Sequence, residues 1–253
     1  MSTDTLALSS APIIEAVVDI DCDMPPSLDL DALDAVAKHS LGDRYPVARR
    51  RLANEHLIAG VDTGAVSVTS RQALQALQYL AADERQIVQW RPNGFSFNRL
   101  APYGRLDDYL PEIERNWKDF AAIAKPVLCR TVRLRYINRL ALPTKGGQVE
   151  LNDYLRVAPR SADDRRFTFA GFLSQQSMID NVTGSHVNVV MATQPQTQGD
   201  TLPVIFDIEV LQMLLSEPGD WPALSVKIAE LRALKNLVFE QSLTESCLNL
   251  YRP

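Results

Sequence analysis

Segments with β-strand character follow one another in groups, and an amphipathic helix-like segment closes each group. The first half of the chain reads strand, helix, up to four strands, helix, and the second half reads strand, short helix, three strands, helix. Strands that follow one another in runs pair antiparallel, whereas a doubly wound parallel sheet alternates its strands with helices. The sequence therefore predicts an α+β fold.

The individual elements are predicted from hydrophobic periodicity, which is two in strands and about 3.6 in helices. Strands are expected over 13–22, 46–58, 76–82, 87–91, 94–100, 127–142, 167–179, 185–194 and 202–211, and helices over 29–40, 106–124 and 151–157 and in a closing segment that carries Leu224 to Val238. Ser27 is the expected cap of the first helix. Pro92-Asn93-Gly94, between two alternating runs, predicts a β-hairpin.

The similar order of elements predicts two related halves, residues 1–125 and 126–253. Each half is expected to be a curved antiparallel sheet with helices packed on one face (β-α-β(3–4)-α), as in TATA-binding-protein-like duplications. Because residue identity between the halves is negligible, this prediction rests on element order alone. One continuous domain is the alternative.

Common catalytic signatures are missing from the sequence. There is no GxSxG elbow, P-loop or HExxH pattern, and no GxGxxG motif follows a strand. The three cysteines, Cys22, Cys129 and Cys247, are far apart and are expected to be small core residues rather than a disulfide framework or a zinc site. No catalytic residue, cofactor or metal is assigned, and a non-enzymatic role is favoured.

The N-terminal stretch has no positive charge before its short apolar segment, so it lacks the pattern of a secretory signal. No run approaches the roughly 18 apolar residues of a membrane-spanning helix. The expected location is the cytoplasm, with no membrane association.

An arginine-rich strand is the main candidate site. RTVRLRYINRLAL, residues 130–142, contains no acidic residue although the chain has a formal net charge of -5. Side chains alternate faces along a strand, so Arg133, Arg135 and Arg139 share one side. Planar guanidinium groups bind carboxylate or phosphate through two hydrogen bonds, so these three residues are candidates for an anion-binding cradle.

The first strand offers an acidic counterpart. Glu15, Asp19 and Asp21 share its polar face, and they would lie close to the arginines if the two opening strands are neighbours in a duplicated sheet. Cross-strand ion pairs with a purely structural role are the favoured reading of this pattern, and such pairs contribute about 0–1 kcal/mol each when exposed.

Two alternatives add further candidates. A nucleic-acid interface would combine Arg91, Arg99 and Asn98 with the aromatic residues Trp90, Phe95, Phe97 and Tyr136, which could stack on bases. A metal-dependent phosphohydrolase would use Asp19-x-Asp21-x-Asp23 to hold a divalent cation and Arg133-x-Arg135 to hold phosphate. The acidic balance of the chain and the absence of an RNP or KH signature disfavour the nucleic-acid reading.

Four stretches carry a family resemblance: APIIEA at 11–16, QWRPNGFSFNRLAPY at 89–103, LRYINRLALP at 134–143 and LKNLVFEQSLTE at 234–245. In this order they make the chain resemble a sporadically distributed TIGR family of conserved hypothetical bacterial proteins over essentially its full length. The resemblance implies a standalone, cytosolic bacterial accessory protein and brings no catalytic residue with it. The leading hypothesis is a protein-binding or regulatory module that acts through a protein partner or as a homo-oligomer.

Overall fold

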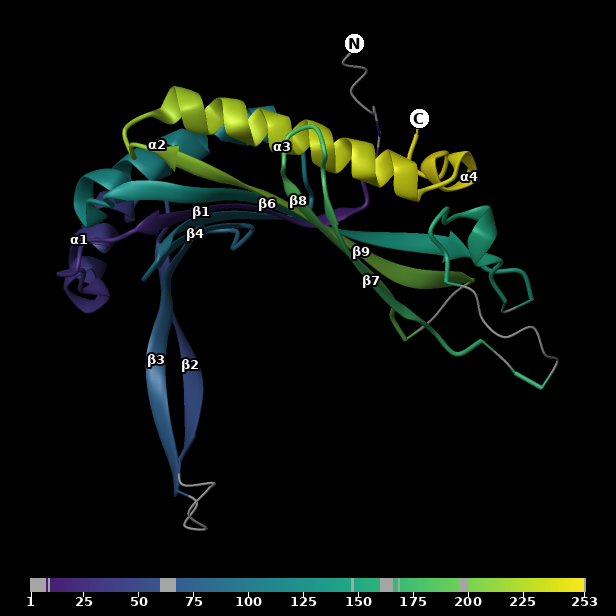
Figure 1. Cartoon of the computed structure of the whole chain (residues 1–253), viewed down its shortest axis with the longest axis horizontal. Helices are drawn as coiled ribbons and strands as arrows, with labels where there is room; N and C mark the ends of the chain where they lie inside the picture. The colour runs from purple at the N-terminus through teal and green to yellow at the C-terminus, as the bar shows by residue number, and fades with distance from the viewer. Residues whose placement is uncertain are drawn as a thin grey trace.

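The computed structural model describes residues 8, 10–59, 67–146, 148–159, 166–167, 169–195 and 200–252, with backbone alone for 54–59 and 67–71. One sheet dominates the fold (Figure 1). Its strands are β1 (Ile13–Asp23), β2 (Val47–Ala59), β3 (Ser67–Leu80), β4 (Gln86–Arg91), β5 (Gly94–Leu100), β6 (Leu128–Pro143), β7 (Leu173–Ile179), β8 (His186–Thr193) and β9 (Thr201–Ser216). The helices are α1 (Leu30–Leu41), α2 (Leu106–Ala124), α3 (Trp221–Ser242) and α4 (Glu245–Leu248), with a 3₁₀ turn, η2, at Leu151–Asp153.

The nine strands pair antiparallel throughout, in the order β2-β3-β4-β5-β1-β6-β9-β8-β7. The two strands that open the sequence halves, β1 and β6, are therefore neighbours near the middle of the sheet. The fold is α+β, as predicted, and both halves of the chain contribute to one continuous sheet.

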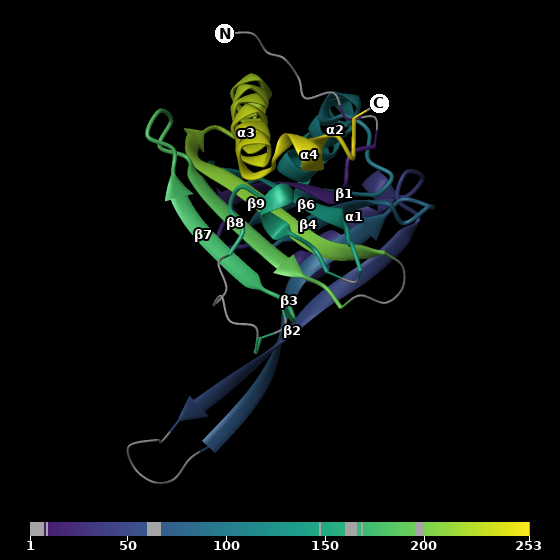
Figure 2. The ribbon, with the colours of Figure 1, turned by 90° about the vertical axis from the view of Figure 1, so that its right-hand side faces the viewer.

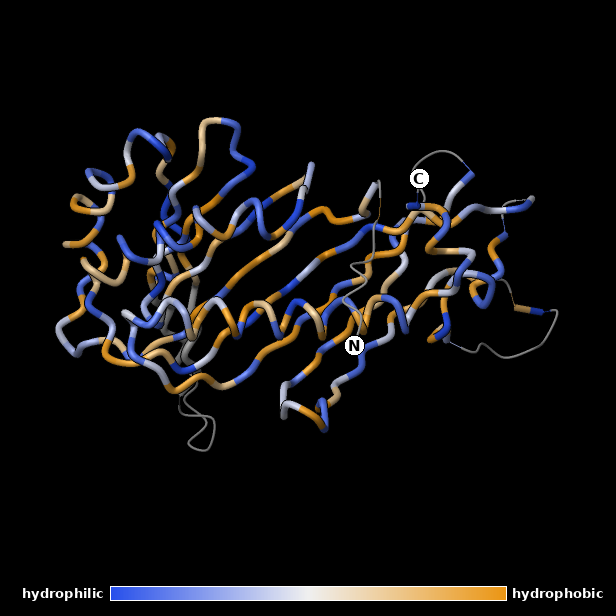
Figure 3. Tube along the Cα trace, turned by 90° about the horizontal axis from the view of Figure 1, so that it is seen from above, coloured by the Kyte–Doolittle hydropathy of each residue, from blue (hydrophilic) through white to orange (hydrophobic). Residues whose placement is uncertain are grey.

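Helices cover one face of the sheet (Figures 1 and 2). α3 packs on β6 and β9, α2 packs on β5, and α1 packs against α2 and β3. Seen from above, polar and apolar residues alternate along the strands (Figure 3), which gives the sheet one apolar face for the helices to bury. None of the described helices is both long enough and apolar enough to cross a membrane.

The core beneath α2 is aromatic. Trp90 and Phe95 from the sheet meet Trp117 and Phe120 from the helix, with ring centroids 5.5 to 5.8 Å apart. All four side chains are almost completely buried. Burying a large apolar side chain contributes about 1.5–3 kcal/mol, so this cluster is a main anchor of α2 on the sheet.

The hairpin predicted at Pro92-Asn93-Gly94 joins β4 to β5, with Arg91 opposite Gly94. Gly94 has φ +146°, and a Cβ atom there would lie 2.1 Å from the carbonyl oxygen of Ile20 on β1. Glycine is needed here because the turn and the neighbouring strand leave no space for a side chain.

Several boundaries differ from the sequence prediction. β3 begins at Ser67 rather than near Ala76, and together with β2 it forms a long hairpin that leaves the sheet (Figure 1). The helix expected over 151–157 is only the turn η2, and the strand expected from 167 begins at Leu173. Asp29, not Ser27, caps α1, because its carboxylate accepts hydrogen bonds from the amides of Asp31 and Ala32.

Candidate functional site

The face of the sheet opposite the helices, called the open face below, has no helix over it in the part of the chain that the structure describes (Figure 2). Its charged residues in the central strands are Glu15, Asp19 and Asp21 from β1, Arg91 from β4, Arg133, Arg135 and Arg139 from β6, and Asp207 and Glu209 from β9. They lie there because the alternate positions on these strands are apolar and pack beneath the helices.

A row of hydrogen-bonded amides crosses one side of the open face. Gln78 on β3 donates to Gln89 on β4 (3.0 Å), and Gln89 donates to Asn98 on β5 (2.7 Å). Asn98 in turn donates to the carboxylate of Glu15 on β1 (2.7 Å). Asn98 is thus brought beside the predicted acidic residues, but its side chain is already used within the sheet.

Arg133 is surrounded by acidic residues from both neighbouring strands. Its guanidinium nitrogens lie 3.7 Å from Asp19, 3.6 Å from Asp21 and 3.5 Å from Glu209. Arg91 approaches the same acids from the other side, 2.8 Å from Asp21 and 3.7 Å from Asp19. The expected cross-strand ion pairs between the first strand and the arginine strand are therefore present.

The polar row continues to the edge of the sheet. Asn188 on β8 donates to Glu209 (3.0 Å), and Ser177 on β7 donates to Asn188 (2.8 Å). Ser96 on β5 donates to Asp19 on the opposite side of the cluster. Side-chain contacts thus connect the strands from β4 to β7 across the open face.

Arg135 forms a two-pronged ion pair. Its Nε lies 3.0 Å from both carboxylate oxygens of Asp207, and its terminal nitrogen lies 2.5 Å from one of them. The pKa of Arg135 is raised by this hydrogen bonding, so the guanidinium stays charged. Asp207 was not among the predicted residues, because sequence spacing alone does not show that β9 lies next to β6.

The charge balance of the open face decides what it can bind. Arg91, Arg133 and Arg135 each have a carboxylate within 3.7 Å, so their charge is compensated inside the protein. Arg139 is exposed, and among the described residues it has no ion pair. The nine charged residues named above comprise five acids and four arginines, a net charge of −1, so the face is a charge mosaic rather than a positive cradle.

Arg99 and the aromatic residues lie on the other face. Arg99 pairs in register with Ala16 and stacks on the ring of Tyr109 at 5.1 Å, beneath the helix side of the sheet. The other members of the proposed stacking set, which are Trp90, Phe95, Phe97 and Tyr136, are buried in the core. The structure therefore corrects the interleaved aromatic–arginine surface, since none of these rings is accessible to a base.

Asp23 does not join the acidic cluster. A β-bulge separates Asp21 from Cys22 in the pairing with β6, and Asp23 forms an ion pair with the exposed Arg130 (2.5 Å). Within the described ranges, no group of three or more His, Cys, Asp or Glu side chains is arranged to hold a metal ion.

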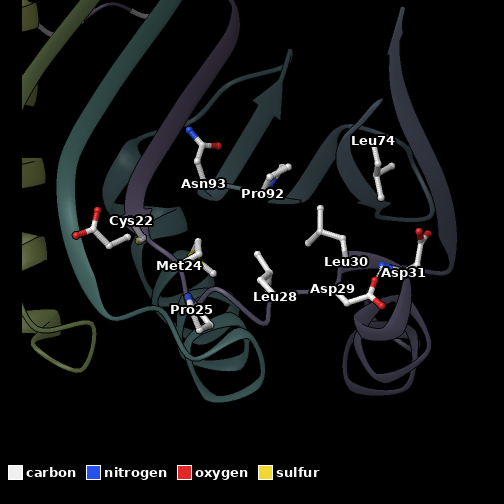
Figure 4. Close-up of a pocket in the computed structure, with 11 residues that line it drawn as sticks. Cys22, Met24, Pro25, Leu28, Asp29, Leu30, Asp31, Leu74, Pro92 and Asn93 are labelled. Atoms are coloured by element: carbon white, nitrogen blue, oxygen red, sulfur yellow. Dashed lines mark hydrogen bonds between the residues drawn. The ribbon is translucent and has the colours of Figure 1, made fainter. Parts of the chain in front are cut away.

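A hollow lies where the β2–β3 hairpin leaves the sheet (Figure 4). It is lined by Cys22, Asp23, Met24, Pro25, Leu28, Asp29, Leu30, Asp31, Leu74, Pro92 and Asn93. A second hollow shares Leu74, Pro92 and Asn93 with it and extends to Arg51 and Arg91 on the open face. These hollows could not be predicted from the sequence, because they depend on the direction in which the β2–β3 hairpin leaves the sheet.

The chain matches no protein-family model, and no curated protein is significantly similar to it. The candidate site therefore stands on its geometry.

Proposed function

We propose that this protein is a non-enzymatic protein-binding or regulatory module that self-associates through the edge strand β7. The composition of this strand and its unpaired edge support the proposal. β7 has no charged residue and no proline, and among the described residues it pairs with β8 alone. Leu173 and Ile179, at its two ends, are 73% and 60% exposed.

Edge strands ordinarily carry features that prevent pairing with another chain, such as charged side chains, proline or bulges. The other edge of this sheet follows that rule, since β2 carries Arg49, Arg50 and Arg51 and its pairing with β3 shifts register after Arg51. β7 is unprotected and β2, at the opposite edge of the sheet, is protected, which supports association at one edge only. Addition of a strand to such an edge is a common mode of protein recognition.

β7 also has a sequence that fits a second copy of itself. In an antiparallel pair related by a two-fold axis perpendicular to the sheet, opposing residues must lie on the same face. With Gln176 opposite its own copy, Leu173 faces Ile179 and Ser174 faces Met178. This register pairs the exposed apolar ends and extends the open face across both subunits.

The oligomeric state tests this proposal. We expect a concentration-dependent dimer by sedimentation velocity or light scattering, and we expect the double substitution Leu173→Lys/Ile179→Lys to leave a folded monomer because lysine on an edge strand opposes pairing. Val226→Lys is the matched control, since Val226 is a similarly exposed apolar residue (58%) on α3. A wild-type protein that stays monomeric, or a dimer that survives the double substitution, would contradict the proposal.

We further propose that the two halves of the sheet, residues 1–125 and 126–253, are related by duplication in the manner of TATA-binding-protein-like folds. The order of strands supports this. Counted outward from the centre of the sheet, β1-β5-β4-β3 corresponds to β6-β9-β8-β7. In the sequence, α2 follows β5 and α3 follows β9, so each helix comes after the last strand of its half. β2 and α1 would then be additions to the first half.

A second candidate function is binding of nucleic acid or another phosphorylated ligand at the open face. Two arginines favour it: Arg139 has no ion pair within the described part of the chain, and Arg51 borders the same hollow as Arg91. This function predicts salt-sensitive binding of single-stranded oligonucleotides that weakens in Arg51→Ala/Arg139→Ala. Lys118→Ala, which removes an exposed positive charge on α2, is the control, and equal loss in both variants would leave only non-specific attraction.

A further inference from the structure

Cys22 and Cys129, which are far apart in the sequence, face each other across the central strand pair. The register of β1 and β6 places Cys22 directly opposite Cys129. Both side chains lie in the core, on the helix side of the sheet. Cys22 follows the regular alternation of β1. Cys129 would lie on the open face with Thr131 and Arg133, but the bulge between Thr131 and Cys129 turns it to the helix side. Both cysteines are free thiols in the structure.

Opposed positions on neighbouring antiparallel strands are within reach of a disulfide. Directly opposed residues of an antiparallel pair have Cα atoms about 4.5–5.5 Å apart and side chains on the same face. A disulfide requires Cα atoms about 4.4–6.8 Å apart. The bond can therefore form between these strands without a large movement of the backbone.

The two thiols differ in acidity. Contact with the thiol of Cys22, and then with the hydroxyl of Ser216, holds the pKa of Cys129 below its ordinary value, whereas the neighbouring Cys129 sulfur and burial raise the pKa of Cys22. Ser216 lies opposite Cys129 on β9, and its buried hydroxyl has no other hydrogen-bond partner in the described part of the protein. Cys129 is thus the better nucleophile of the pair.

The two thiols also differ in access. Cys22 is 8% exposed and lines the hollow at the base of the hairpin, beside Met24 (Figure 4). Cys129 has no exposed surface. Cys22 is therefore the member of the pair that borders the hollow, and Cys129 is the fully enclosed member.

We propose that Cys22 and Cys129 are a redox-modification site, at which exchange with a low-molecular-weight disulfide produces a reversible bond between β1 and β6. The Cys22 thiol gives its proton to the neighbouring Cys129 thiolate and attacks one sulfur of the small disulfide, which forms a mixed disulfide and releases one small thiolate; that thiolate takes the proton from Cys129. The Cys129 thiolate then attacks the Cys22 sulfur and releases the second small thiolate. The two protein thiols are oxidised by two electrons, the small disulfide is reduced to two thiols, and these take up the two protons that the cysteines lose.

This site is independent of the self-association proposed above, because it lies at the centre of the sheet and not at β7. The bond would join the opening strand of one half of the chain to the opening strand of the other.

Thiol counting on the native protein tests the proposal. The full-length protein is equilibrated with mixtures of reduced and oxidised glutathione, alkylated under denaturing conditions and measured by intact mass. We expect the alkylated thiols to fall from three to one, with a peptide map that links Cys22 to Cys129 and a return to three with dithiothreitol. Cys247→Ser is the matched control, and it is expected to fall from two thiols to none.

Two variants separate the roles of the cysteines. Cys129→Ala is expected to trap glutathione on Cys22 as a stable mixed disulfide, while Cys22→Ser is expected to keep both remaining thiols. Three free thiols at every glutathione ratio would overturn the proposal, as would a link that involves Cys247 or joins two chains. Because the wild-type measurement needs no substitution, a variant that fails to fold leaves the test intact.

Discussion

Lys235 on α3 is a buried cation on the helix side of the sheet. Its side chain is 9% exposed, and its ammonium lies 4.1 Å from the centroid of the Tyr136 ring on β6. Burial, followed by the positive charge of Arg232, lowers the pKa of Lys235 to about 8, while Glu240 acts in the opposite direction. Tyr136 stays neutral through this range, because burial raises its pKa to about 12.

We expect the contribution of Lys235 to the free energy of unfolding to rise as the pH increases from about 8 towards the ordinary pKa of lysine. It is measured as the difference between the wild type and Lys235→Met, because buried groups whose pKa is raised, such as Cys247 and Tyr136, contribute in the opposite direction in both proteins. In this window the folded protein has released the Lys235 proton while the unfolded chain still holds it, so raising the pH favours the folded state. Lys235→Met is expected to remove this rise and to stabilise the protein at pH 7 by up to about 3 kcal/mol, less whatever the contact with the Tyr136 ring contributes. Urea unfolding between pH 7 and 10.5 measures both effects.

Lys118→Met is the control for this experiment, because Lys118 is an exposed lysine on α2 (64% side-chain exposure). It should leave the pH dependence of unfolding unchanged. An unchanged slope in Lys235→Met would show that Lys235 does not titrate in this window.

The ion pair between Arg135 and Asp207 is expected to have a measurable coupling energy. The two-pronged geometry strengthens this ion pair, but Arg135 is 45% exposed, and solvent therefore screens the interaction. A double-mutant cycle with alanine is expected to give a coupling energy of about 1 kcal/mol. The pair formed by Arg252 and Glu245 should give less, because the Glu245 side chain is 65% exposed whereas that of Asp207 is 14% exposed. Equal couplings for the two pairs would contradict the role assigned to the two-pronged geometry.

Part of this residue-level arrangement follows from sequence alternation and part does not. Alternation places Asn98 and Arg99 on opposite faces, but the sequence does not show which face the helices cover. Both residues were therefore predicted to belong to the same nucleic-acid interface. The acids of β1 and the arginines of β6 could be paired because each strand has one polar side. Cys22 and Cys129 could not, since their pairing depends on a register and on bulges that no local pattern specifies.

The hairpin between β4 and β5 depends on one glycine. Gly94→Ala is expected to lower the free energy of unfolding by more than about 2 kcal/mol, because the backbone has φ +146° and the new methyl group would overlap the carbonyl oxygen of Ile20. Chemical denaturation measures the loss. Gly219→Ala is the control, since a Cβ atom at Gly219 would contact nothing within 4 Å, and a similar loss in both variants would contradict this account.

Elements with strong periodicity were predicted well, and those defined by tertiary contacts were not. The predicted range of α2, residues 106–124, is confirmed because its apolar stripe and the following Lys125-Pro126 mark both ends. β9 extends to Ser216, beyond the predicted end at 211, because β6 continues to provide hydrogen bonds after the alternation weakens. The missing helix after Leu151 reflects a segment too short to be stable without partners.

At the scale of the whole molecule, residues near the two ends of the described chain lie together, since the amide of Ser10 donates to the carbonyl oxygen of Tyr251 at 3.3 Å. We therefore expect a circular permutant that begins at Pro126, runs through a short Gly-Ser linker from Arg252 to Ser10, and ends at Lys125 to fold with one cooperative transition. Far-UV circular dichroism and thermal unfolding measure this. A permutant opened between Leu134 and Arg135, inside β6, is the control that should fail.

The overall α+β class and the antiparallel sheet were predictable because runs of strands have few other solutions. That both halves contribute to a single sheet was not, since the sequence does not show whether β1 pairs with β6 or with a strand of its own half alone.

The central pairing of β1 with β6 has a consequence for biosynthesis. When the first half of the chain has left the ribosome, β1 has β5 on one side and nothing on the other until residues 128–143 are translated. This exposed backbone belongs to a nascent chain and resembles the strand edges on which chaperones and aggregation act. Slow translation immediately after α2 should therefore reduce the yield of native protein, whereas a pause after β6 should not.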